Sequence, residues 1–144
     1  MPERLNGGRL NRPRILLADD HQLMLELVAA LLQSKFDVVG AAHTGREMIA
    51  EVMRLNPDLI VSDISMPELS GIDAARHLRE KGSMAKLVFL TADVSDEFLD
   101  ACLAEGALGY VVKSRIETDL IPAINSALAG RCFISRRGQS TQPR

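Results

Sequence analysis

Four short apolar runs, each closed by a polar or charged residue, constrain the fold of this 144-residue chain more than any other feature. The runs occupy residues 15–18, 59–62, 87–90 and 110–112. Runs of this length predict strands buried on both faces, which are typical of a parallel sheet covered by helices on either side. Because parallel strands all point the same way, their polar terminal residues gather at one edge, where open α/β folds place their sites.

The residues that close these runs predict a site for a divalent cation and a phosphate group. Asp19 and Asp20 follow the first run, Asp63 the second, Thr91 the third and Lys113 the fourth. One pocket is therefore expected to hold three carboxylates, one hydroxyl and one ammonium group. Carboxylate oxygens are ligands that Mg²⁺ prefers, and positive charge stabilises a phosphoryl group during transfer.

The segments between these runs predict helices, and an additional strand is expected at residues 38–42. The result is an α/β fold in which five strands alternate with five helices through right-handed crossovers. Three hydroxyl residues are expected to be helix N-caps: Thr44, Ser70 and Ser95. The last helix is expected to begin near Thr118, to hold Pro122 in or just beyond its first turn, and to end at Gly130.

Apolar residues recur at helical spacing in the first two predicted helices. In the first helix these positions are Leu23, Leu27, Ala30 and Leu31. In the second, the positions expected to face inward are Met48, Ile49, Val52 and Met53. The predicted fourth helix has an apolar set that forms either an exposed contact stripe or the core side of the helix, and the sequence leaves both options open: Phe98, Leu99, Cys102 and Leu103.

Composition indicates one globular domain, since 47% of the residues are hydrophobic and 25% are charged. No apolar stretch approaches the roughly 20 residues of a membrane span, and no signal-peptide pattern opens the chain. Cys102 and Cys132 are isolated and show no metal-ligand spacing, which favours reduced thiols. We therefore expect a cytoplasmic protein without a membrane partner.

The net charge of −2 is distributed unevenly. Residues 1–14 carry +3 and residues 131–144 carry +4, which leaves −9 on residues 15–130. An acidic body repels nucleic acid phosphates, so we expect no direct DNA binding by this chain. We expect a single domain over residues 13–134, flanked by flexible basic termini at 1–12 and 135–144.

In these motifs the sequence resembles the receiver domain of two-component response regulators over about residues 13–134. The matching segments are Asp19-Asp20-His21, Asn56-Pro57-Asp58 before Asp63, Met66-Pro67, Gly71, Thr91-Ala92 and residues 106–114. The stretch from Gly109 to Ser114 is most similar to the receivers of LuxR-type regulators, whereas many other receivers have proline where Ser114 stands. The resemblance implies a flavodoxin-like sheet in the order 2-1-3-4-5.

The resemblance also implies the roles of the site residues. Asp63 would accept a phosphoryl group from a sensor histidine kinase or a phosphotransfer protein. The Mg²⁺ ligands would be Asp20, Asp63 and the backbone carbonyl of Ser65, with Asp19 acting through a water molecule.

The remaining implied roles belong to the phosphoryl contacts and the switch. Lys113 and Thr91 would contact phosphoryl oxygens. Thr91 and Tyr110 would form the switch, in which Tyr110 turns from exposed to buried. This change would rearrange the face made by the fourth helix, the fifth strand and the fifth helix.

Two output arrangements fit the sequence: a single-domain receiver that acts through protein contacts, including a phosphorylation-dependent homodimer, or the input half of a LuxR-type transcription regulator. The alternative from another class is a phosphatase or phosphotransferase that forms an aspartyl phosphate. Phosphatases of the haloacid dehalogenase type place their nucleophile at the end of the first strand in an Asp-x-Asp arrangement. Here the two acids are adjacent, and the expected nucleophile closes a later strand. We therefore expect a phosphoacceptor that catalyses at most its own phosphorylation and dephosphorylation.

Overall fold

A single sheet of six parallel strands forms the centre of the computed structural model, which describes residues 12–92 and 95–135. The strands are β1 (Arg14–Ala18), β2 (Asp37–Ala42), β3 (Leu59–Asp63), β4 (Lys86–Thr91), β5 (Gly109–Val112) and β6 (Phe133–Ile134). Their order is β2-β1-β3-β4-β5-β6. The predicted parallel order 2-1-3-4-5 is confirmed, and β6 extends it by one short strand that the sequence did not reveal.

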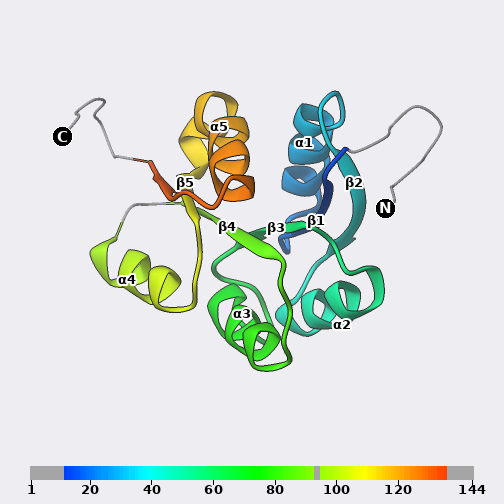
Figure 1. Cartoon of the computed structure of the whole chain (residues 1–144), viewed down its shortest axis with the longest axis vertical. Coiled ribbons are helices and arrows are strands. Elements are labelled where there is room, and N and C mark those ends of the chain that lie inside the picture. Colours follow the sequence, from blue (N-terminus) through cyan, green and yellow to red (C-terminus); the bar gives the residue numbers. More distant parts are fainter. Residues whose placement is uncertain (1–11, 93–94, 136–144) are drawn as a thin grey trace.

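Five helices cover the two faces of this sheet. They are α1 (Gln22–Leu32), α2 (Gly45–Leu55), α3 (Gly71–Glu80), α4 (Asp96–Ala104) and α5 (Ile116–Leu128). Helices α1 and α5 lie on one face, and α2, α3 and α4 lie on the other (Figure 1). With both faces covered, the ends of the strands are the places where polar groups of the sheet can meet solvent.

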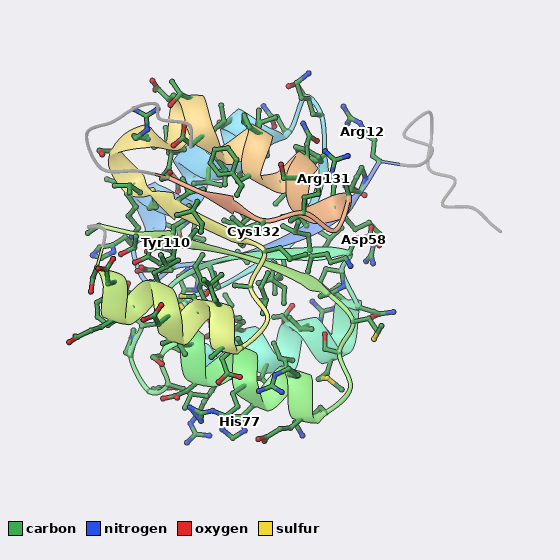
Figure 2. The ribbon with its side chains drawn as sticks, turned by 60° about the vertical axis from the view of Figure 1, so that its left-hand side comes forward. Arg12, Asp58, His77, Tyr110, Arg131 and Cys132 are labelled. Atoms are coloured by element: carbon green, nitrogen blue, oxygen red, sulfur yellow. The ribbon has the colours of Figure 1, made fainter. Side chains whose placement is uncertain are left out.

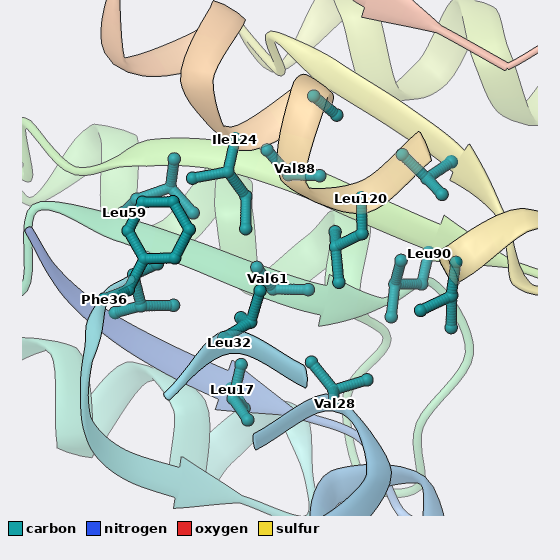
Figure 3. Close-up of a cluster of buried hydrophobic side chains, with 14 of the residues drawn as sticks. Leu17, Val28, Leu32, Phe36, Leu59, Val61, Val88, Leu90, Leu120 and Ile124 are labelled. Atoms are coloured by element: carbon teal, nitrogen blue, oxygen red, sulfur yellow. The ribbon is translucent and has the colours of Figure 1, made fainter. Parts of the chain in front are cut away.

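The core has two apolar clusters, one on each face of the sheet. Strand β3 contributes to both, because Leu59 and Val61 point toward α1 and α5 whereas Ile60 points the other way. Figure 3 shows the first cluster, in which side chains of α1 and α5 such as Leu32 and Ile124 pack onto the strands. Burial on both faces explains why the central strands are continuous apolar runs in the sequence.

Hydroxyl side chains begin three of the helices, as predicted. Each accepts a hydrogen bond from the backbone N–H three residues later: Glu47 to Thr44, Asp73 to Ser70, and Phe98 to Ser95. Such caps satisfy N–H groups that have no partner inside the helix. Local bonding of this kind depends on neighbouring residues, which is why the sequence predicted it.

The start of α5 differs from the prediction. The helix begins at Ile116, directly after a 3₁₀ turn at Lys113–Arg115, rather than near Thr118. Pro122 therefore lies inside the helix and not at its first turn. Arg115 pairs with Asp119 one turn later, with Nε 2.9 Å from Oδ2, and this pair stabilises the first turn of the helix. Gly130 follows the helix end with a φ of 79°, as expected for a C-terminal glycine.

Two of the predicted apolar faces differ from those in the structure. Leu23 and Leu27 of α1 are 79% and 50% exposed, and the buried residues of this helix are instead Leu25, Val28 and Leu32. Helix α1 is apolar on most sides, so periodicity could not select the side that faces the sheet. In α2 the buried apolar residues are Met48 and Val52, whereas Met53 is exposed, so the inward placement of Met53 is wrong.

The structure decides between the two options for the apolar residues of α4. Cys102 is buried and Leu99 is half-buried, so one side of the set faces the core. Phe98 and Leu103 are exposed, so the other side reaches solvent. The apolar set is therefore partly core and partly surface.

The predicted flexible termini lie mostly outside the described residues, since these begin at residue 12 and end at residue 135. Ser135 itself, which we placed in the C-terminal flexible segment, is buried, with a 2% exposed fraction. Contacts with α5 and β5 hold it there. In the described part of the chain, no helix is both long and apolar enough to cross a membrane.

Gly71, the first residue of α3, generates a testable prediction about the loop after β3. A Cβ atom at this position would lie 2.1 Å from the backbone oxygen of Asp63 and 2.8 Å from Oγ of Ser62. Gly71→Ala should therefore lower the free energy of unfolding by about 1–3 kcal/mol, as overpacking does. Urea unfolding of the variant and the wild type measures the difference.

Gly82→Ala is the matched control, because a Cβ atom there meets no atom within 4 Å and the cost is only that of its positive φ of 87°. We expect that cost to be about 1–2 kcal/mol. Gly71→Ala should also perturb the amide NMR signals around Asp63, which Gly82→Ala should leave in place. An unchanged unfolding midpoint and spectrum for Gly71→Ala would contradict the crowded packing.

Candidate functional site

Four strand ends bring the predicted site residues to one edge of the sheet. Asp19 directly follows β1, Asp63 is the last residue of β3, and Thr91 is the last residue of β4. Lys113 directly follows β5 and begins the 3₁₀ turn. The sequence prediction that these residues share one edge is thus met by their positions in the structure.

The acids form a compact cluster whose donor atoms fit a divalent cation. One donor atom from each of Asp19, Asp20, His21 and Asp63 lies within 4.8 Å of the others. Asp19 and Asp63 are buried, whereas Asp20 and His21 are exposed. Carboxylate oxygens are hard donors that suit Mg²⁺.

Asp19 provides a specific test of this fit. Its Oδ2 atom is buried and accepts no well-aligned hydrogen bond from the described residues, although the ammonium group of Lys113 lies 3.1 Å away. A buried carboxylate oxygen gains from further positive charge in its neighbourhood. The cluster can therefore accommodate a cation on electrostatic grounds.

Lys113 connects two of the acids. Its Nζ atom lies 3.1 Å from Oδ2 of Asp19 and 3.3 Å from Oδ2 of Asp63. Burial opposes the charge of this ammonium group, but the close carboxylates of Asp19 and Asp63 outweigh it, so the pKa of Lys113 is raised. Lys113 therefore remains a cation within the site at neutral pH.

The carboxyl group of Asp63 has a raised pKa. Burial is the largest cause, and the nearby charge of Asp19 adds to it. Lys113 and a backbone hydrogen bond from Ser65 act in the opposite direction without cancelling the increase. The positive charge present is thus insufficient to compensate for the two buried acids, which leaves the site favourable for an additional cation.

His21 is the N-cap residue of α1, directly after the two acids. Its backbone N–H donates to Oδ1 of Asp19 at 2.9 Å, and its ring Nδ1 lies 3.2 Å from the same atom and 3.3 Å from Oδ1 of Asp20. Sequence reasoning missed this contact of the ring with the acids. The direct succession of His21 after the two acids was the available signal.

An open depression of about 460 Å³ gives solvent access to the site. It is lined by Asp20, His21, Asp63, Ile64, Ser65, Thr91, Ala92, Ser95, Phe98 and Lys113. A similar depression of about 480 Å³ at the opposite edge of the sheet is lined by Asp58 and Lys86 among mainly uncharged residues. The first depression is the one with clustered carboxylates beside an ammonium group.

The predicted switch residues occupy neighbouring strands. Thr91 is buried and borders the depression. Tyr110 is fully buried, and its hydroxyl group donates to the backbone oxygen of Ser95 at 3.4 Å, at the N-cap of α4. Sequence reasoning expected Ser95 to cap a helix but did not identify it as the partner of Tyr110. Tyr110 thereby connects β5 to the start of α4.

Comparison with known proteins identifies a family model and relatives that match this chain. The family model of the response regulator receiver domain matches residues 15–125. The nitrate/nitrite response regulator protein NarL of Escherichia coli is 35% identical over 123 residues, which cover 84% of this chain and 57% of NarL. The transcriptional regulatory protein DegU of Brevibacillus brevis is 32% identical over 136 residues, which cover 93% of this chain and 56% of DegU. The chain therefore spans somewhat more than half the length of these relatives.

Solved structures show the same similarity. A LuxR-family two-component response regulator from Aurantimonas sp. SI85-9A1 superposes with a TM-score of 0.81 and 31% identity, covering 87% of this chain and 90% of that one. The signal receiver domain of a NarL response regulator from Mycobacterium tuberculosis gives a TM-score of 0.79 and 25% identity, covering 83% and 98%.

The raised pKa of Asp63 predicts how its removal changes stability without added metal. The folded protein holds the proton more tightly than the unfolded chain, so charged Asp63 reduces stability as pH rises above the ordinary carboxyl value of 3.8 and through the raised folded pKa. In EDTA near neutral pH, Asp63→Asn should therefore unfold at a higher urea concentration than wild type. Below pH 3.8 this advantage should disappear.

Asp100→Asn is the control, because it removes an exposed acid of α4 outside this cluster. Its unfolding midpoint should remain close to that of the wild type across the same pH range. If Asp63→Asn is instead less stable than wild type at neutral pH, the charge of Asp63 is stabilising and our interpretation of the cluster is wrong.

Proposed function

Because the chain belongs to the response regulator receiver domain family, we propose that it accepts a phosphoryl group on Asp63 from a sensor histidine kinase or a phosphotransfer protein. The observation that carries this proposal is the position of Lys113. Its ammonium group lies 3.3 Å from Asp63 and 3.1 Å from Asp19, in a depression open to solvent. A nucleophilic carboxylate and a cation beside it are what phosphoryl transfer requires.

In the proposed step, a carboxylate oxygen of Asp63 attacks the phosphorus of a phosphohistidine. The new O–P bond forms as the N–P bond breaks, and the imidazole of the donor is the leaving group. Negative charge spreads over the three remaining phosphoryl oxygens during transfer. Lys113 stabilises one of these oxygens, and the hydroxyl group of Thr91 donates a hydrogen bond to another.

We propose Mg²⁺ as the cation of the acidic cluster. Asp20, Asp63 and the backbone carbonyl of Ser65 are the proposed direct ligands, and Asp19 is proposed to act through a water molecule. The hard oxygen donors and the uncompensated burial of Asp19 and Asp63 support this assignment. When bound, Mg²⁺ supplies positive charge that neutralises the phosphoryl oxygens.

We propose that Thr91 and Tyr110 convert this chemistry into a signal. A phosphoryl group on Asp63 gives the Thr91 hydroxyl a new partner, which favours one packing of β4, β5 and α4 over another. The contact of Tyr110 with Ser95 supports the inclusion of α4 in this change. Exposed Phe98 and Leu103 on α4 provide apolar surface for a protein partner or for a phosphorylation-dependent homodimer.

Two outputs of the whole protein fit this receiver domain. DegU is named as a transcriptional regulatory protein, and this chain spans 56% of it. We therefore retain both arrangements: the input part of a transcription regulator, or a receiver that acts through protein contacts alone. We assign no DNA contact to residues 15–130, because their charge of −9 repels phosphates.

The phosphoacceptor assignment predicts one labelled residue. Incubation with acetyl phosphate and Mg²⁺ should add a single phosphate to the wild-type protein, measured by intact mass. Asp63→Asn should remain unlabelled, because its amide cannot form the acyl phosphate. The control Asp58→Asn, at the opposite edge of the sheet, should be labelled like the wild type. Labelling of Asp63→Asn would rule out the assignment.

The cation assignment predicts a stability change that does not depend on phosphorylation. At ten times its dissociation constant, Mg²⁺ should raise the free energy of unfolding of the wild type by about 1.4 kcal/mol. Asp20→Asn should show a much smaller increase because one ligand is lost, whereas the Asp100→Asn control should respond like the wild type. Thermal unfolding over a Mg²⁺ titration gives the comparison, and an equal response in Asp20→Asn would place the metal elsewhere.

A further inference from the structure

The segment after α5 returns to the sheet and pairs with β5. Strand β6 is parallel to β5, with Phe133 opposite Gly109 and Ile134 opposite Tyr110. The backbone N–H of Phe133 donates to the oxygen of Leu108 at 2.9 Å. Figure 2 shows the segment that contains Cys132 running along β5, between α5 and α4. The chain thus covers the lateral side of β5 that faces away from β4, which we call the β5 edge, with its own C-terminal residues.

Ser135 anchors this segment through two hydrogen bonds. Its backbone N–H donates to the oxygen of Tyr110 at 2.8 Å, and its hydroxyl group donates to Oδ2 of Asp119 at 2.6 Å. Ser135 and Asp119 are 2% and 7% exposed. A hydrogen bond to a charged, buried acceptor is stronger than an ordinary one. The two bonds of Ser135 therefore hold the end of the 133–135 segment against β5 and α5.

Asp119 is arranged to serve as the acceptor. Besides Ser135, its carboxylate accepts hydrogen bonds from Arg115, with Nε at 2.9 Å, and from the hydroxyl group of Thr118 at 3.1 Å. Burial disfavours the charge, but these side-chain hydrogen bonds outweigh it and lower the pKa of Asp119. The carboxylate is therefore ionised at neutral pH and attracts the Ser135 hydroxyl.

The same segment is connected to the phosphoryl site by two short routes. Arg115 shares the 3₁₀ turn with Lys113, so the residue that contacts Asp63 and the residue that holds Asp119 belong to one three-residue turn. On the other side, Tyr110 contacts Ser95 with its hydroxyl group and Ser135 with its backbone oxygen. Lys113 and Tyr110 are thus the residues through which a change at the phosphoryl site can reach the Ser135 contacts.

We propose that the β5 edge is a docking site for the chain's own residues 133–135, that Asp119 is its anchor, and that its occupancy depends on the phosphoryl state of Asp63. We call residues 133–135 the C-terminal latch. The second half of this proposal rests on the proposed function, whereas the docking itself does not. Through the latch, the phosphoryl site communicates with the C-terminal side of the domain.

Amide hydrogen exchange followed by NMR tests the docking. The informative amides are those of Phe133 and Ser135, because they donate to the β5 side of the sheet. Ser135→Ala removes the bond to Asp119 while leaving both amides in place. Loss of a hydrogen bond to a charged group should accelerate their exchange by about ten- to hundredfold. Amides of β3 should retain wild-type rates, which shows that the fold is intact.

Two further variants make the docking test specific. Asp119→Asn should accelerate the same two amides, because it removes the charged acceptor. Glu117→Gln removes an exposed acid of the same helix and should leave both rates unchanged. Wild-type rates in Ser135→Ala, or equal acceleration in Glu117→Gln, would overturn the docking proposal.

Beryllofluoride, a mimic of the phosphoryl group, tests the coupling in the presence of Mg²⁺. A bound ¹⁹F NMR signal first establishes that the Asp63 site is loaded. Loading should change the exchange rates of the Phe133 and Ser135 amides by about fivefold or more in the wild type, the lower end of allosteric couplings. In Ser135→Ala, which already lacks the hydrogen bond to Asp119, loading should produce a much smaller change.

The outcomes separate the two proposals. A bound ¹⁹F signal with unchanged exchange at Phe133 and Ser135 would overturn the coupling while leaving the phosphoacceptor function in place. Absence of any bound signal would overturn the proposed function, and the coupling with it. Neither result would affect the docking, which is measured in the free protein by Ser135→Ala.

Discussion

Parallel pairing of all six strands is the constraint on which the remaining structure depends. It requires a crossover helix between successive strands, and the helices then cover both faces of the sheet. Groups at the carboxyl ends of the strands are left at a common edge. Asp19 and Lys113 are distant in the chain, yet their side chains lie 3.1 Å apart for this reason. The site is therefore a consequence of the topology and not of any local sequence segment.

The electrostatics of this edge are incompletely balanced. Two buried acids, Asp19 and Asp63, share the ammonium group of Lys113, and the pKa of Asp63 is still raised. An isolated domain would be more stable with less charge at this position, because unpaired buried charge is costly. A site arranged this way gains from any ligand that brings positive charge. Such a cost is typical of residues retained for function.

Asp119 makes the contrast with Asp63 clear. Both carboxylates are buried, with exposed fractions of 7% each, yet their pKa values shift in opposite directions. Asp119 receives side-chain hydrogen bonds from Arg115, Thr118 and Ser135, whereas Asp63 shares its lysine with a second acid. The donors around each carboxylate, together with its burial, decide the direction in which its pKa shifts. One acid is equipped to hold a neighbouring segment, and the other remains available for chemistry.

The sequence by itself determined the features that depend on neighbouring residues. The apolar strand runs, the polar residues that close them and the hydroxyl caps of α2, α3 and α4 could be predicted, because burial on both faces and capping have local signatures. Resemblance to receivers added the strand order and the roles that we propose for the site residues. Only the tertiary structure decided which side of α1 faces the sheet, where α5 begins and that Ser135 is buried. These depend on contacts between distant segments, such as Ser135 with Asp119, which neither periodicity nor composition encodes.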